Sequence, residues 1–107
     1  MPGLIDEKYS HAAAQFKEHS SALHPAYQEW HKKVNFEGVL DKKTKELISL
    51  GISCAIRCSY CIDAHAQKAI SHGASKEEIA EVIHIAALIN AGSAISYGVN
   101  AFQYFKE

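Results

Sequence analysis

The sequence predicts an all-α protein, folded as a compact bundle of about six helices. Apolar residues recur mainly at the three- and four-residue spacing of a helix face, and no stretch has the alternating Val, Ile and Thr pattern of a strand. Helix boundary signals also recur along the chain. The clearest is Ser75-Lys76-Glu77-Glu78, where Ser75 can accept from the N3 amide while the Glu78 side chain reaches back.

Three helices are predicted in the first half of the chain. The first runs from Asp6 to about His19 and is weakly amphipathic. The second begins near Pro25, which suits a first helical turn, and stops at Gly38. The third follows Asp41, which can act as its N-cap, and ends near Arg57, with a run of solvated lysines on one side.

Three more helices are predicted in the second half. The fourth, a central helix, begins at the Cys58-x-x-Cys61 segment and stops at Gly73. The capping box opens a fifth, Ile79 to about Asn90, which is apolar on nearly every side and must therefore be buried all round. Gly92 separates it from a last segment, Ser93 to about Phe105. Because so small a domain has little interior, we expect this surface to be buried between subunits of a homo-oligomer.

Length and charge narrow the class of protein. The 107 residues suit one domain that spans 1–107. A net charge of -1 gives no field to attract phosphate backbones, so we expect no nucleic-acid partner. The N-terminus has no basic region followed by an apolar run, and no segment approaches the roughly 20 apolar residues of a membrane span. These features predict a cytoplasmic protein without a membrane partner.

The cysteines point to redox chemistry. Cys54, Cys58 and Cys61 lie within eight residues, whereas a disulfide scaffold staples distant segments. The Cys58-x-x-Cys61 spacing lets two sulfurs meet across one helical turn, and a helix start stabilises a thiolate. His65 lies four residues beyond Cys61 on the same helix face, so its imidazole could take or return the thiol proton.

The chemistry-bearing residues follow a fixed spacing: Glu46 is followed after eleven residues by Cys58-x-x-Cys61, and His65 comes after three more. This pattern resembles the signature of the alkylhydroperoxidase D and carboxymuconolactone decarboxylase family, and the resemblance covers roughly Leu40 to Asn100. The resemblance implies an all-α fold, trimers or hexamers, and reduction of hydroperoxides or disulfides. It implies Cys61 as peroxidatic nucleophile, Cys58 as resolving thiol and Glu46 with His65 as proton relay. An external dithiol would reset the enzyme, and no cofactor is expected.

Two observations conflict with what the resemblance implies. The helix dipole alone favours Cys58 as the more acidic thiol, whereas the family pattern assigns attack to Cys61. The chain also has Tyr60 where the family's peroxidases carry a histidine between the cysteines. Loss of that proton carrier predicts a lower peroxidase rate.

Glu46 can reach the site only if the chain bends. On one straight helix it would lie about 18 Å from Cys58. If the helices fold back near Arg57, Glu46 and His65 lie at similar depths, roughly 15 and 10 Å from the turn, so contact between them is predicted. The alternative is a solvated glutamate among the neighbouring lysines.

Other functions stay open. Cys58, Cys61, His65 and either Glu46 or His84 could bind zinc, although no second close-spaced ligand pair is present. A lactone decarboxylase, or an oligomeric scaffold with an idle redox site, are further alternatives.

Two residues receive a structural interpretation. Cys54 is interpreted as a small buried thiol, and His84 as a core or interface histidine.

Overall fold

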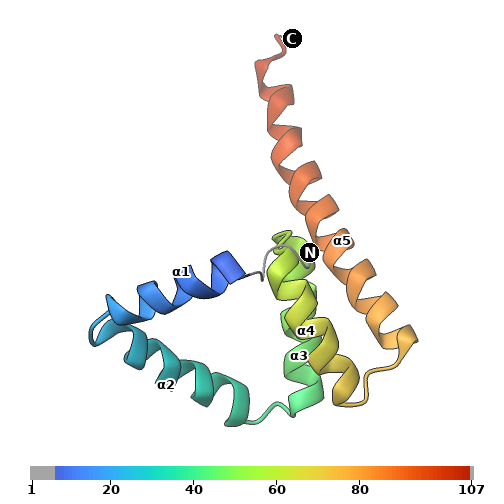
Figure 1. Ribbon diagram of the computed structural model, residues 1–107. Coiled ribbons are helices and arrows are strands. Elements are labelled where there is room, and N and C mark those ends of the chain that lie inside the picture. Colours follow the sequence, from blue (N-terminus) through green and yellow to red (C-terminus); the bar gives the residue numbers. More distant parts are fainter. Residues whose placement is uncertain (1–6, 107) are drawn as a thin grey trace.

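The computed structural model describes residues 7–106, and the regular secondary structure in this range is entirely helical (Figure 1). The elements are α1 (Glu7–Glu18), α2 (Leu23–Phe36), α3 (Lys42–Ala55), α4 (Ser59–Ser71), α5 (Lys76–Gly98) and the 3₁₀ helix η2 (Val99–Tyr104). The all-α prediction is confirmed. This range has five α-helices, slightly fewer than the six or so that were predicted, and one short 3₁₀ helix. The predicted first residue of the first helix, Asp6, lies outside the described residues.

Helices α3 and α4 form the antiparallel hairpin at the centre of the structure (Figure 1). Leu50 and Ala69, 2% and 0% exposed, belong to the small core of the described chain. The chain reverses at Arg57, whose φ of 56° lies in the left-handed region, and the Cys58 amide closes the turn by donating to the Ser53 carbonyl at 2.9 Å. The predicted bend near Arg57 is therefore confirmed.

The start of α5 is anchored by the predicted signals. Gly73, with φ of 96°, ends the turn after α4, where a side chain would be strained. Ser75 and Glu78 then form both bonds of the capping box, at 3.0 and 2.9 Å. Together these residues direct α5 back along α3.

Helix α5 packs closely on α3, and a polar contact joins the two helices at each end of their contact. A Cβ atom on Gly51 would lie only 3.3 Å from Val82 Cγ1, so a glycine at this position permits the close approach. At one end of the contact Lys43 pairs with Glu78, and at the other the Asn90 side-chain amide donates to the Ala55 carbonyl at 3.1 Å.

One expectation for α5 is wrong, and a second is not met within the single chain. The helix continues through Gly92, because a single glycine costs a helix interior only about 1 kcal/mol and Ala91 and Ala94 near it are strong helix formers. Within the single chain the helix is also not buried all round, since Ala86 is its one buried residue. From Ile85 onward, large apolar side chains of α5 and of η2 are exposed, namely Ile85, Leu88, Ile89, Ile95, Tyr97, Val99, Phe102 and Tyr104.

By length and composition, the continuous stretch Lys76–Tyr104 could cross a membrane, which corrects the expectation that no segment approaches such a length. This is weak evidence, because the core helix of a water-soluble protein passes the same test. The single chain is also more open than the expected compact bundle. Its radius of gyration is 18.5 Å, against about 13 Å for a compact domain of this size.

Helices α1 and α2 form an arm that touches the hairpin near its two ends (Figure 1). Near the start of α1, Tyr9 packs against Tyr60 on α4, with ring centroids 5.3 Å apart. At the end of α2, the Asn35 side-chain and backbone oxygens accept from the Lys42 ammonium at 3.3 and 3.5 Å. The arm therefore meets both the cysteine segment and the first turn of α3.

Candidate active site

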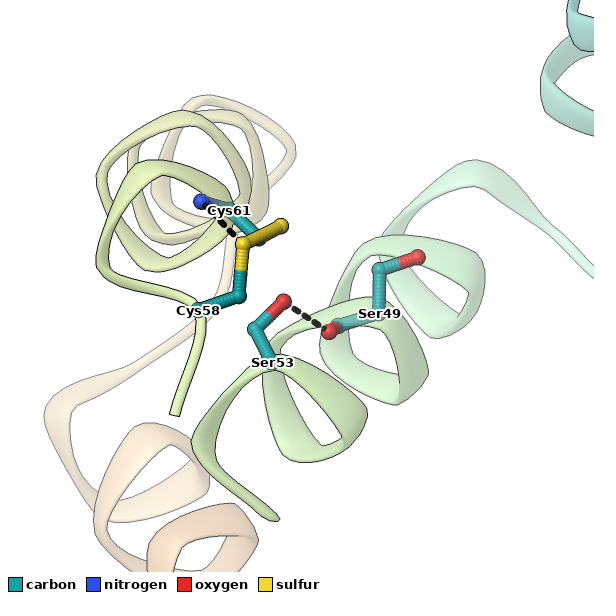
Figure 2. The surroundings of a disulfide bond; sticks show 4 residues. All are labelled: Ser49, Ser53, Cys58 and Cys61. Carbon is teal, nitrogen blue, oxygen red and sulfur yellow. Dashed lines mark hydrogen bonds between the residues drawn. A yellow bond between two sulfur atoms is a disulfide. The ribbon is translucent and has the colours of Figure 1, made fainter. Parts of the chain in front are cut away.

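Cys58 and Cys61 are joined by a disulfide at the N-terminus of α4 (Figure 2). Their Cα atoms are 5.2 Å apart and both residues are half-buried. One helical turn thus brings the two sulfurs together, in two residues that are not fully buried.

Cys58 is the N-cap of α4. Its Sγ accepts the Cys61 backbone N–H at 3.2 Å, the place that an Asp or Ser oxygen fills in an ordinary N-cap. The free amides and the positive end of the helix dipole both stabilise negative charge on this sulfur once the disulfide is reduced. The local electrostatics therefore favour Cys58 as the site where thiolate charge accumulates.

Glu46 and His65 meet across the α3–α4 hairpin. His65 Nδ1 lies 3.0 Å from Glu46 Oε1 and 3.4 Å from Oε2, so the predicted contact is confirmed and the solvated alternative is wrong. The Glu46 carboxylate is 0% exposed and the His65 side chain is 25% exposed. Because the carboxylate accepts the Nδ1 proton, the Nε2 atom of the neutral ring is left as the proton acceptor.

Lys42 is a residue of this site that the sequence interpretation missed. Its Nζ lies 3.9 Å from Glu46 Oε2, and it also stacks over the Phe36 ring at 4.7 Å from the centroid. Its charge offsets that of the buried carboxylate, which would otherwise be costly to keep ionised. The signal was the four-residue spacing from Glu46 on one helix face, which was outweighed by the run of neighbouring lysines.

Two serines of α3, the buried Ser53 and the half-buried Ser49, lie near the disulfide (Figure 2). Ser53 is 3% exposed and its hydroxyl donates to the Ser49 carbonyl at 2.6 Å. The Ser49 hydroxyl donates to the Lys45 carbonyl at 2.8 Å and points away from the sulfurs. Figure 2 shows the Ser53 hydroxyl on the side of α3 that faces Cys58.

Tyr60 keeps its phenol neutral. Its pKa is raised above the ordinary value, chiefly by its hydrogen bond with Tyr9 and then by partial burial. A phenol with a raised pKa does not exchange protons readily near pH 7. Tyr60 therefore does not replace the imidazole that its position would otherwise supply.

The other candidate residues lie apart from this arrangement. Cys54 is a free thiol but is half-buried, which corrects its interpretation as a buried one. His84 is exposed on α5, so it is not a core histidine of the single chain. Among residues 7–106, no three His, Cys, Asp or Glu side chains are placed to hold a metal ion. The described structure thus does not assemble the zinc ligand set considered from the sequence.

The comparison with protein families places most of the chain in one group. Residues 22–104 match the model of the carboxymuconolactone decarboxylase family. A protein of Paracoccus denitrificans, called uncharacterized protein 4 in cox locus, is 32% identical over all of this chain and 96% of its own length. The alkyl hydroperoxide reductase AhpD of Coxiella burnetii is 47% identical over 57 residues, 53% of this chain, but only 32% of its own length is matched.

Solved structures share the fold. A protein from Methanobacterium thermoautotrophicum superposes with a TM-score of 0.74 and 35% identity, covering 79% of this chain and 98% of that one. The apo form of a carboxymuconolactone decarboxylase family protein from Legionella pneumophila gives a TM-score of 0.69 at 28% identity, covering 92% and 88%.

Proposed function

Because the chain belongs to the carboxymuconolactone decarboxylase family, we propose that it is a thiol-dependent peroxidase and disulfide oxidoreductase that cycles the Cys58–Cys61 pair between dithiol and disulfide. The observation that carries the proposal is the disulfide at the N-terminus of the helix that also bears His65, which is paired with a buried carboxylate. The chain spans about a third of the length of the AhpD protein that it matches, so the activity of that protein enters only as support.

In the oxidative step, His65 Nε2 takes the thiol proton of Cys61 and the resulting thiolate attacks the terminal oxygen of a hydroperoxide. The O–O bond breaks, the alkoxide leaves as an alcohol with the proton held by His65, and Cys61 becomes a sulfenic acid. The sulfur gives two electrons and the peroxide gains two. Glu46 orients the imidazole and stabilises its protonated form during the transfer.

Resolution and reset complete the cycle. The Cys58 sulfur attacks Cys61 Sγ, the S–O bond breaks, and the hydroxyl leaves as water after taking the remaining thiol proton. An external dithiol then reduces the disulfide by two thiol exchanges and is itself oxidised to a disulfide. The substrate is a hydroperoxide, or a disulfide when the cycle runs as thiol exchange.

The lactone decarboxylase alternative uses none of this arrangement. That chemistry, as the resemblance implies, belongs to relatives without the cysteine pair, whereas this chain retains both cysteines at one helix turn. The cysteine pair therefore favours the redox function.

The test is peroxide consumption with a dithiol donor by the wild type and by single Cys→Ser variants. We expect Cys61→Ser to abolish turnover, and Cys58→Ser to stop after one equivalent of peroxide with a trapped sulfenic acid on Cys61. Cys54→Ser is the matched control, since Cys54 is a half-buried free thiol four residues before Cys58 in the sequence and outside the disulfide, and it should keep full turnover. Sustained turnover by Cys58→Ser would overturn the two-cysteine cycle.

We further propose a cytoplasmic homo-oligomer, trimer or hexamer, in which copies of the chain cover one another's α5. A groove of about 390 Å³ between α3 and α5 has an apolar lining, and the exposed apolar residues of α5 continue from it. So large an apolar surface is rare on a monomer. A reducing compartment would supply the thiols that the cycle consumes.

A further inference from the structure

We propose that the Ser53 hydroxyl changes its hydrogen-bond acceptor with the redox state of the site, from the Ser49 carbonyl in the disulfide form to the Cys58 thiolate in the dithiol form. The inference rests on the proposed function in that it assumes that the cysteine pair is reduced and reoxidised. It assigns Ser53 a role in setting the redox equilibrium, and this role needs no peroxide to be measured.

Ser53 is held against Cys58 by the backbone. Its carbonyl accepts the Cys58 N–H at 2.9 Å, so the two residues stay neighbours across the turn that links α3 to α4. The side chain is 3% exposed and its hydroxyl lies on the Cys58 side of α3 (Figure 2). A hydroxyl this buried has few acceptors other than those the protein provides.

The present acceptor can be given up at little cost. The Ser49 carbonyl is four residues before Ser53 in α3, so in the helix it also receives the Ser53 backbone N–H. Rotation of the side chain by one staggered step about χ1 would move the hydroxyl away and leave that carbonyl still bonded. The Ser53 hydroxyl is thus a donor that can be reassigned.

Reduction creates the acceptor. When a donor thiolate attacks Cys61 Sγ, the S–S bond breaks and its electron pair remains on Cys58 Sγ as a thiolate. A disulfide sulfur is a weak acceptor, whereas a charged sulfur attracts donors much more strongly. The Cys61 N–H already points at this sulfur at 3.2 Å, and the Ser53 hydroxyl would be the second donor. The second exchange leaves the external donor as a disulfide and both cysteines reduced.

The consequence is measurable as an equilibrium. A hydrogen bond made only in the dithiol form favours reduction, so Ser53→Ala should lower the equilibrium constant for reduction by roughly tenfold. A purely structural role would not move this constant, because it would weaken the oxidised and reduced forms alike.

The experiment equilibrates the purified 107-residue protein with mixtures of reduced and oxidised glutathione and counts free thiols by alkylation and mass. Ser49→Ala is the matched control, since it removes a hydroxyl of the same helix that bonds Lys45, away from the sulfurs, and it should stay within twofold of the wild type. A Ser53→Ala constant equal to that of the wild type would overturn the inference. Peroxide turnover is measured separately, so its absence in a normally titrating wild type would overturn the proposed function and leave the Ser53 result readable.

Discussion

Glu46 and His65 are 19 residues apart in the chain, yet the carboxylate and the imidazole are 3.0 Å apart because α3 and α4 fold back on each other at Arg57. The carboxylate has no solvent exposure. A charge in such a place is retained at a cost in folding free energy unless it is paired. Its pairing with an imidazole four residues beyond Cys61, one half of the disulfide, is what makes the hairpin a catalytic candidate.

Glu46→Gln should reduce the peroxide kcat/KM by about 100-fold while the protein remains folded, because the amide no longer stabilises the protonated imidazole. Steady-state peroxide consumption checks the rate, and circular dichroism checks the helix content. Glu78→Gln is the control, since Glu78 bonds Lys43 and Ser75 at the start of α5 and should leave turnover unchanged. Equal rates for Glu46→Gln and the wild type would remove the dyad from the mechanism.

Local signals predicted the parts of this structure that local geometry decides. The Ser75–Glu78 capping box, the stop at Gly73 and the Cys58 start of α4 each depend on a few adjacent residues, and each is found where the sequence places it. The contact of Glu46 with His65 followed from helix rise once a bend near Arg57 was assumed.

Features decided by packing could not be obtained in this way. Whether α5 continues through Gly92 depends on the small free-energy cost of one glycine in a helix compared with the helix-forming tendency of the residues around it. The prediction of a break at Gly92 gave that cost too much weight. The role of Lys42 required knowing that Glu46 is buried, since the same lysine beside an exposed carboxylate would be an ordinary surface pair.

Tyr60→His should raise the rate of reaction with hydroperoxides by roughly tenfold, because it places an imidazole that titrates near pH 7 between the two cysteines. Tyr60→Phe is the comparison, since it keeps an aromatic ring beside Tyr9 and removes only a phenol whose raised pKa keeps it protonated. We expect the Phe variant to match the wild type. Stopped-flow measurement of the first peroxide equivalent separates this step from reset by the dithiol, and a slower His variant would contradict the prediction.

Stability should fall in acid partly through Glu78. The hydrogen bond from Lys43, followed by that from the Ser75 amide, holds the pKa of Glu78 below its ordinary value near 4.5. A lowered folded-state pKa stabilises the fold above the unfolded-state value, and this contribution is lost as the pH falls through the folded-state value. Glu78→Gln should therefore lower the urea midpoint at pH 7 and have a smaller effect at pH 3.

Glu77→Gln is the control for that titration. It removes a carboxylate from the same first turn of α5 without removing a bond to Lys43. Its difference from the wild type at pH 7 should be smaller than that of Glu78→Gln. A Glu78→Gln deficit that is the same at pH 7 and pH 3 would show that the ion pair does not contribute to the pH dependence.

Ile89→Glu should convert the proposed oligomer into smaller species, because Ile89 lines the groove between α3 and α5 and is 64% exposed in the single chain. A charge buried without a partner in an interface is strongly destabilising. Light scattering after gel filtration measures the mass, with Gln67→Glu on the exposed side of α4 as the control that should retain the wild-type mass. If the wild type is itself monomeric at micromolar concentration, the apolar face of α5 is not covered by copies of this chain, and the prediction is wrong.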